Sequence, residues 1–453
     1  MRYMIYVWMA LAAVLVCACG DDDDSAPITD GGMDAGEDGG DDGGTGTDTQ
    51  DTDTGTDTGT GEDNVPPDLP ALCKAVVVNQ PASGKADGRT PDLAVADADA
   101  GLLVYGYNDV TTPPDWDVEA KPYAPGEGLA DASVEPVPAP VLGEEPSLAA
   151  RGGEFGLVWL DTRWDPACDP ENQDACRRDI AFTRLGPDGL PADGAVATRV
   201  TLNANVKVRP VIAATDSGFL VVWNDGSASE AVVRAVGLDP LGGPAAVQAL
   251  SGEESIVAHT VPAIAAMGDT AVVAWLRADQ QGIAARAVGA DATPFGSVTV
   301  VDEGVLASVP GIAAGEDGFL VSWSRETNGE MEVFTRRLDP NGAPSAPAAR
   351  ATWVKGDVTQ SRPAWNGTGF GLAWLSQRDN GTDKCAETSC ENQVFVSLLD
   401  AYGVPVSRAV RLSDNPNVCV DLAFAWDGGG FAAAWELLRD MRWQIYWGRA
   451  VCE

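Results

Sequence analysis

The chain has 453 residues, of which 68 are acidic, 29 are basic and one is histidine, so its formal net charge is −39 at pH 7. So acidic a protein repels phosphate backbones and anionic headgroups, which argues against nucleic acid and anionic lipid as partners. The single histidine, His259, excludes a histidine triad and a histidine-rich metal centre. Its apolar setting in VAHTVP favours a structural role.

Residues 1–19 have the features of an export signal, because Arg2 precedes an apolar run too short to cross a bilayer comfortably. The run ends in VCAC, which resembles the lipobox of bacterial lipoproteins, although Cys17 departs from it. The resemblance implies that Cys19 is diacylated and anchors an exported protein to a bacterial membrane, at the cell surface or facing the periplasm. An ordinary cleaved signal with a chance cysteine is the alternative.

Residues 20–64 consist almost wholly of Asp, Gly and Thr and contain no Lys or Arg. Such a segment cannot bury enough apolar surface to offset the entropy of ordering, and its charges repel one another. We therefore expect a disordered, extended acidic tether, followed by a folded domain over residues 65–453.

The folded domain contains seven copies of a repeat, spaced by 48 to 64 residues. Each copy passes from small apolar residues through a turn to an apolar run that ends on an aromatic residue, as in PVIAATDSGFLVVW. A polar segment, a strand-like run with a turn such as LDPNG, and a fourth short run follow. Every unit therefore offers four strands. The closing aromatic residues are Tyr105, Trp159, Trp223, Trp275, Trp323, Trp374 and Trp435.

Seven units of about fifty residues with four strands each predict an all-β fold, a seven-bladed β-propeller with four-stranded antiparallel blades. Each closing aromatic ring is expected to pack between adjacent blades. The last unit stops at its third strand, whereas an unassigned strand, CKAVVVNQP, precedes the first unit. We therefore expect residues 73–79 to complete the seventh blade beside residues 444–452, which closes the ring.

The cysteines fit this closure, and export favours disulfides. Cys73 and Cys452 lie on the two closing strands, while Cys168 with Cys176, and Cys385 with Cys390, each close a short loop. Cys419 is left over, either as a buried thiol or as an alternative partner for Cys385 or Cys390. The loops lack the spacing of zinc ligands, and the acidic turns lack a full set of calcium ligands, so we expect no metal or other cofactor.

Arginine and carboxylate residues recur in the polar segment after each closing Trp. Because these segments join the second and third strands, we expect them on one face, together with the two longest loops, residues 160–179 and 375–393. The alternative is that Arg and Asp pair with each other and fasten adjacent blades. The candidate binding residues are Asp161, Arg163, Trp164 (taken as exposed), Asp225, Arg277, Asp279, Arg325, Arg378, Asp379, Arg439 and Asp440.

The combined pattern aromatic-x-Val-x-Trp, Asp-x-Arg, Asp-Ile-x-Phe and Leu-Asp-x-x-Gly resembles tandem repeats of bacterial surface lipoproteins with predicted propeller domains. The second unit carries it best, in FGLVWLDTRWD and RDIAFTRLGPDG. The resemblance implies an exported propeller and no particular activity. The chain is also similar to sialidase-like propellers, but it lacks their Ser-x-Asp-x-Gly-x-x-Trp box.

Two functions from different classes remain. The first is a noncatalytic, membrane-tethered surface protein, expected to be a monomer, that presents one propeller face to an unidentified protein or glycan. The second is a carbohydrate-active hydrolase or lyase that uses carboxylates such as Asp161 and Asp379, with Arg163 and Arg378, at the propeller mouth.

Overall fold

The computed structural model describes residues 68–453, apart from gaps at 85–86, 98–99, 109–115, 138–142, 170–175, 203–206, 227–230, 252–259, 278–280, 306–307, 328, 354–357, 377–391 and 414–417. The expected signal and tether lie outside the described residues. The only helical element in the described ranges is the 3-10 helix η2 (Ala192–Gly194). None of their helices is long and apolar enough to cross a membrane.

The strands form seven four-stranded antiparallel sheets, which are the blades of a β-propeller. Blade 1 contains β2 (Asp87–Asp97), β3 (Ala100–Asn108), β4 (Trp116–Ala124) and β5 (Gly128–Leu129). Blade 2 contains β6 (Gly143–Arg151), β7 (Glu154–Asp161), β8 (Asp179–Leu185) and β9 (Thr198–Arg199). Blade 3 contains β10 (Lys207–Thr215), β11 (Gly218–Asp225), β12 (Val232–Leu238) and β13 (Gln248–Ala249).

The other blades follow the same order. Blade 4 contains β14 (Ala263–Met267), β15 (Thr270–Leu276), β16 (Gln281–Gly289) and β17 (Pro294–Val305). Blade 5 contains β18 (Gly311–Ala314), β19 (Phe319–Thr327), β20 (Glu330–Leu338) and β21 (Ala349–Arg350). Blade 6 contains β22 (Val358–Trp365), β23 (Phe370–Ser376), β24 (Gln393–Leu399) and β25 (Val410–Arg411). Blade 7 contains β26 (Cys419–Trp426), β27 (Phe431–Arg439), β28 (Arg442–Cys452) and β1 (Cys73–Pro81).

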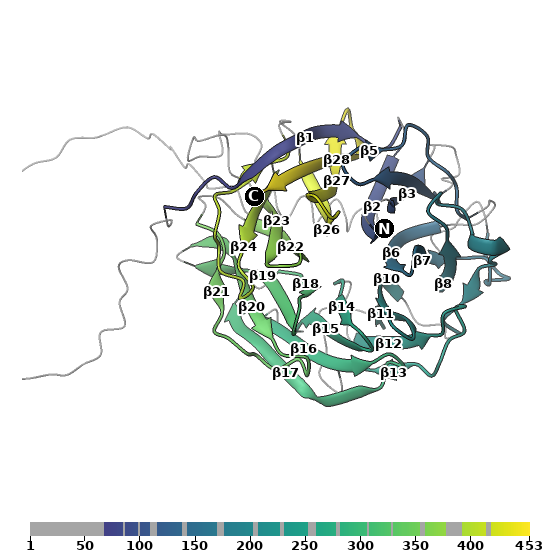
Figure 1. Ribbon diagram of the computed structural model, residues 1–453. Helices are drawn as coiled ribbons and strands as arrows, with labels where there is room; N and C mark the ends of the chain where they lie inside the picture. Colours follow the sequence, from purple (N-terminus) through teal and green to yellow (C-terminus); the bar gives the residue numbers. More distant parts are fainter. Residues whose placement is uncertain are drawn as a thin grey trace, which may run out of the picture. The chain divides into compact units, whose positions relative to one another are not determined.

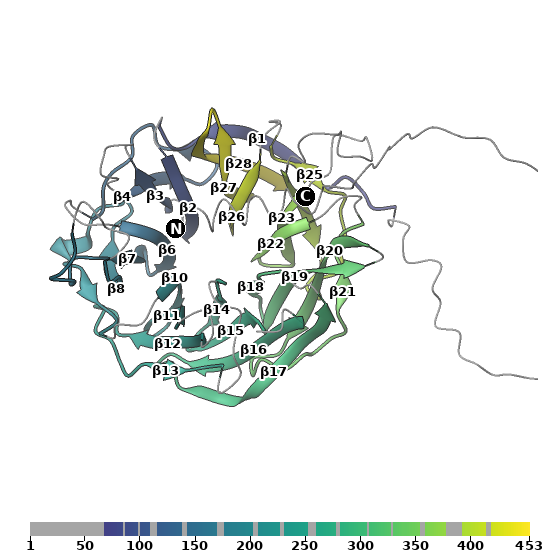
Figure 2. The same cartoon turned by 180° about the vertical axis from the view of Figure 1, so that it is seen from behind.

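The blades form a ring, with the first strand of each unit innermost, as both views of the ribbon show (Figures 1 and 2). The expected seven-bladed propeller is thus confirmed. Because consecutive strands alternate in direction, the loops between second and third strands lie at the same end as the crossings between blades. The inner strands also begin at this end, which we call the crossing face.

Each pair of neighbouring blades shares one apolar cluster that contains one closing aromatic residue. Trp223 of blade 3 packs with Leu160 and Phe182 of blade 2, and Trp275 of blade 4 packs with Leu220 of blade 3. All seven rings are almost fully buried. Burial of such a ring is worth on the order of 2–3 kcal/mol. The remaining five rings, one to a cluster, are Tyr105, Trp159, Trp323, Trp374 and Trp435.

Blade 7 is built from both ends of the folded domain. Its strand order is β1-β28-β27-β26, and Cys73 lies opposite Cys452 in the antiparallel register. The same two residues form a disulfide across a sequence separation of 379. In Figure 1 the purple β1 runs alongside the yellow β28 at the rim of the ring. β1 therefore supplies the outer strand that blade 7 lacks.

We predict that replacing both Cys73 and Cys452 with serine lowers the free energy of unfolding by about 6 kcal/mol in the chain-entropy model, because the disulfide constrains a very long loop in the unfolded chain. The matched control is the pair Cys168→Ser and Cys176→Ser, whose separation is only 8. It should cost about 2.5 kcal/mol in the same chain-entropy model. Denaturant unfolding followed by tryptophan fluorescence measures both values, and equal losses would contradict the role assigned to the closure.

Candidate functional site

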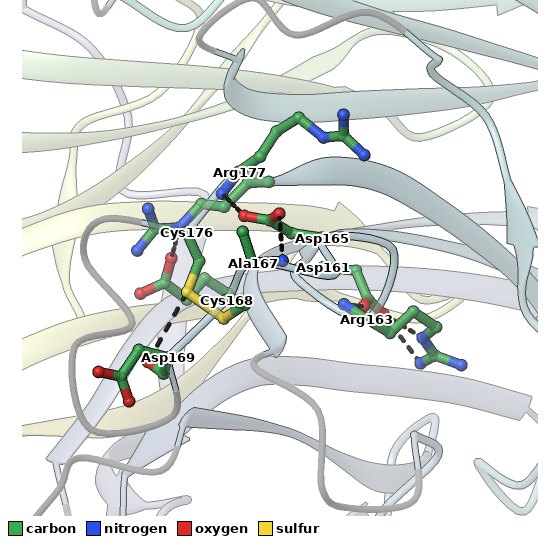
Figure 3. Close-up of a disulfide and its surroundings, with 10 residues drawn as sticks. Asp161, Arg163, Asp165, Ala167, Cys168, Asp169, Cys176 and Arg177 are labelled. Atoms are coloured by element: carbon green, nitrogen blue, oxygen red, sulfur yellow. Dashed lines mark hydrogen bonds and ion pairs between the residues drawn. A yellow bond between two sulfur atoms is a disulfide. The ribbon is translucent and has the colours of Figure 1, made fainter.

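The first insertion follows Trp159 on the crossing face, and its charged residues pair with each other. The buried Asp161 carboxylate accepts hydrogen bonds from the Trp159 indole Nε1 and from Nε of Arg163, each at 2.8 Å. Figure 3 shows the Arg163 guanidinium turned toward Asp161. Burial raises the pKa of Asp161 despite these donors. The pair thus fixes the indole ring rather than offering a free carboxylate.

The same insertion contains the expected disulfide between Cys168 and Cys176 (Figure 3). Next to it, Asp165 accepts hydrogen bonds from the backbone N–H groups of Ala167 at 3.1 Å and Arg177 at 2.7 Å. Cys385 and Cys390, the other expected loop pair, lie outside the described residues.

Trp164 is half-buried, whereas the sequence analysis predicted an exposed side chain. Its ring lies 5.3 Å from the Arg163 guanidinium carbon and 5.8 Å from that of Arg199. Two cation–π contacts cover the ring and hold it against the apolar cluster between blades 1 and 2. Trp164 is therefore part of the packing of its loop.

Two further candidate residues from the sequence also lie in ion pairs. Asp225 is buried and pairs with Arg234 on the next strand of blade 3. Arg325 pairs with Asp302 of blade 4 at 2.8 Å, and Asp302 also accepts the indole N–H of Trp323 at 3.1 Å. The second arrangement joins neighbouring blades, which is the fastening role that the sequence left open.

The remaining candidates differ in exposure. Arg439 and Asp440 lie exposed at the turn between β27 and β28, where Arg439 donates to the Tyr446 hydroxyl at 3.1 Å. Arg277 follows β15 and is half-buried. Asp279, Arg378, Asp379 and His259 lie outside the described residues. Cys419 is buried at the start of β26, and its two alternative partners, Cys385 and Cys390, lie outside the described residues.

A polar group that the sequence did not single out lies where the inner strands begin. We call it the axial cluster; its members are Asp92, Glu145, Arg209, Gln360, Arg362, Asp421 and Glu436. Glu436 follows the closing Trp435 on β27, and the others lie on the inner strands of blades 1, 2, 3, 6 and 7. The cluster lies on the crossing face.

β-Bulges aim several of these side chains. The pairing register shifts between Val208 and Val211 in β10 and between Val420 and Leu422 in β26. Arg209 and Asp421 at these shifts have positive φ values of 21° and 46°. Glu145 in β6 and Thr90 in β2 share the feature, with φ of 54° and 48°. Bulges redirect side chains, and strained backbone at non-glycine residues gathers at functional positions.

One ion pair joins blades that are not neighbours. Arg209 of blade 3 donates through Nη1 to Oδ1 of Asp421 of blade 7 at 2.7 Å. Burial alone would lower the pKa of Arg209, but the Asp421 carboxylate raises it above its usual value. Burial likewise opposes ionisation of Asp421, yet the Arg209 guanidinium holds the pKa of Asp421 below its usual range. Both groups are therefore charged at neutral pH.

Neighbouring blades are also joined through the backbone at the bulges. Glu145 of blade 2 accepts the N–H of Arg209 at 2.7 Å. Asp92 of blade 1 accepts the N–H of Leu148 in blade 2 at 2.8 Å, and Gln360 of blade 6 accepts that of Leu422 in blade 7 at 3.0 Å. These bonds satisfy backbone N–H groups of the inner strands, and that of Arg209 lies at a β-bulge.

Glu436 is a buried carboxyl whose pKa is strongly raised. It accepts the N–H of Thr90 in blade 1 and lies 3.6 Å from the Arg89 guanidinium. Burial raises the pKa of Glu436 to about 8, and the negative charge of Asp421 adds to the rise. Glu436 is therefore mostly protonated at neutral pH. In the part of the chain that the structure describes, the axial cluster included, no group of three or more His, Cys, Asp or Glu residues could hold a metal ion.

Comparison with known proteins assigns the chain to no family. No family model matches the chain, and no curated protein matches it. Similar solved structures, each aligned over 84% of this chain, include a protein of unknown function from Dyadobacter fermentans (9% identity, all of that chain, TM-score 0.46). Others are the haemagglutinin-neuraminidase ectodomain of parainfluenza virus 5 (8%, 86% of that chain, 0.47) and Trypanosoma rangeli sialidase (8%, 60% of that chain, 0.41).

We predict that Glu436→Gln makes stability less sensitive to pH. The folded protein holds the Glu436 proton up to about pH 8, whereas the unfolded chain releases it near the ordinary value of 4.5. The folded state therefore binds more protons in this window, and its stability falls as pH rises through it. Relative to the wild type, the Gln variant should gain stability from pH 5 to pH 8, by on the order of 1 kcal/mol per pH unit at most. Denaturant unfolding at each pH tests this, and parallel curves for the two proteins would refute it.

Proposed function

We propose that this protein is an exported, lipid-anchored and noncatalytic surface protein whose propeller binds a protein or glycan at the axial end of its crossing face. The axial cluster carries this proposal. It combines guanidinium, amide and carboxylate groups from five blades, and its side chains are half-buried except for Glu436, which is buried. Convergent polar groups on a rigid scaffold are typical of binding sites.

The pairing of the charged residues that follow the closing aromatic residues argues against the carboxylates that the enzyme alternative would use. Asp161 is buried and bonded to Trp159 and Arg163, so it is not positioned to reach a substrate. Asp225 and Asp302 are also nearly buried and paired with arginine. These carboxylates support the structure of the blades. Their pairing favours binding over catalysis for this part of the crossing face.

One observation favours the alternative, a carbohydrate-active hydrolase or lyase. The environments of Glu436 and Asp421 move their pKa values in opposite directions, as general acid and base catalysis requires. Against this, only 3% of the Glu436 side chain is exposed, and it already accepts the N–H of Thr90. If the protein is an enzyme, Glu436 and Asp421 are the candidate acid and base, in place of Asp161.

We predict binding without turnover. The full-length chain is screened on a glycan array and against extracellular proteins, and every glycan that binds is then incubated with the protein and its products are analysed. The expected result is a bound ligand that is recovered intact. Cleavage that is lost in Glu436→Gln but kept in Asp161→Asn would instead support the enzyme alternative.

The anchor is a separate prediction that rests on the VCAC motif. The protein is expressed in a bacterium that is fed an alkyne-labelled fatty acid. We expect the wild type and Cys17→Ala to carry the label and to partition into detergent, whereas Cys19→Ala should lose both properties, because only Cys19 lies at the lipidated position. Labelling that depends on Cys17, or on neither cysteine, would refute the assignment.

A further inference from the structure

Arg362 is the arginine of the axial cluster that forms no ion pair with a carboxylate among the described residues. Within the described residues its side chain makes one hydrogen bond, from Nη1 to the carbonyl oxygen of Ser361 at 3.1 Å, and no ion pair. Arg209, by contrast, is bonded to Asp421 at 2.7 Å. Most of the guanidinium donors of Arg362 thus remain available.

The surroundings make this charge costly. Burial and the positive charge of Arg209 together lower the pKa of Arg362 to about 10, although Asp421 and Asp92 partly offset them. Asp421 already accepts from Arg209. Asp92 accepts from the Ser147 hydroxyl at 2.7 Å and from the N–H of Leu148 at 2.8 Å. Arg362 remains a cation at neutral pH, and an external anion would relieve its repulsion from Arg209.

We propose that Arg362 binds the carboxylate of an acidic sugar, such as a uronic acid residue of a glycan, at the axial end of the crossing face. This inference rests on the proposed function and names its ligand class. A guanidinium offers paired N–H donors that match a carboxylate. Gln360 and the carboxylates of Asp92 and Asp421 lie in the same cluster and can accept hydrogen bonds from sugar hydroxyl groups, which are abundant in a glycan and scarce in a peptide.

The overall charge of the protein narrows the ligand further. A strongly acidic chain repels a dense polyanion at long range, whereas its repulsion of a single carboxylate is much weaker. Spaced or terminal carboxylates on a neutral glycan therefore fit better than a nucleic acid or a highly sulfated chain.

The test compares binding of D-galacturonate and D-galactose to the full-length chain by calorimetry. We expect galacturonate to bind at least about tenfold more tightly, as a charge-assisted hydrogen bond would provide. Arg362→Gln should lose at least about tenfold in affinity for galacturonate. The affinity of Arg362→Lys should lie between those of the wild type and Arg362→Gln, because lysine keeps the charge but lacks the paired N–H donors. Arg408→Gln is the matched control in the same blade, since Arg408 is exposed and pairs only with Asp68 among charged groups of the described residues.

The outcomes separate this inference from the proposed function. Unchanged galacturonate binding by Arg362→Gln, or wild-type binding of an acidic peptide but no acidic sugar, would overturn the inference and leave a binding protein. Failure of the wild type to bind any glycan or protein would overturn both. If Arg362→Gln has a lowered melting temperature, the Arg362→Lys comparison decides, because a purely structural cation would leave the galacturonate-to-galactose ratio unchanged.

Discussion

The pairing of β1 with β28 is the constraint on which the other blades depend. Each blade is apolar on both faces and is covered only by its two neighbours, so the ring buries all seven interfaces only when the last blade is complete. β1 gives blade 7 its fourth strand, and the Cys73–Cys452 disulfide holds the pairing. Without β1, the ring would expose the edge of β28, which is one of its longest strands.

Ring closure also explains why the axial cluster can exist. The inner strands can place charged side chains near one another only because the buried aromatic rings and the closed ring hold seven separate segments in register. Arg209 and Asp421 are 212 residues apart in the chain but 2.7 Å apart in space. The cost of burying charge at this position is partly met by bonds from bulge amides, such as that of Arg209 N–H to Glu145. The same rigidity that stabilises the fold therefore prepares a polar site.

The blades could be predicted from the sequence because the repeat has a period, an aromatic marker at each second strand and turns that suit hairpins. The closure followed from counting strands in the last unit. The axial cluster could not be found in this way, since the recurring pattern begins at a proline and residues such as Glu145 and Arg209 lie just before it. No local pattern indicates that a non-glycine residue there adopts positive φ or meets a partner from a distant blade. The ion pair of Asp302 with Arg325 could not be predicted either, because it depends on which blades are neighbours.

Native-state hydrogen exchange of the backbone amides measures the closure most directly. If β1 is an integral strand of blade 7, the amides that pair β1 with β28 exchange only through large opening events. They should then be protected to an extent similar to those that pair β27 with β28. Exchange of the β1 amides at the rate of an unpaired segment, while those between β27 and β28 stay protected, would contradict the closed seven-bladed ring.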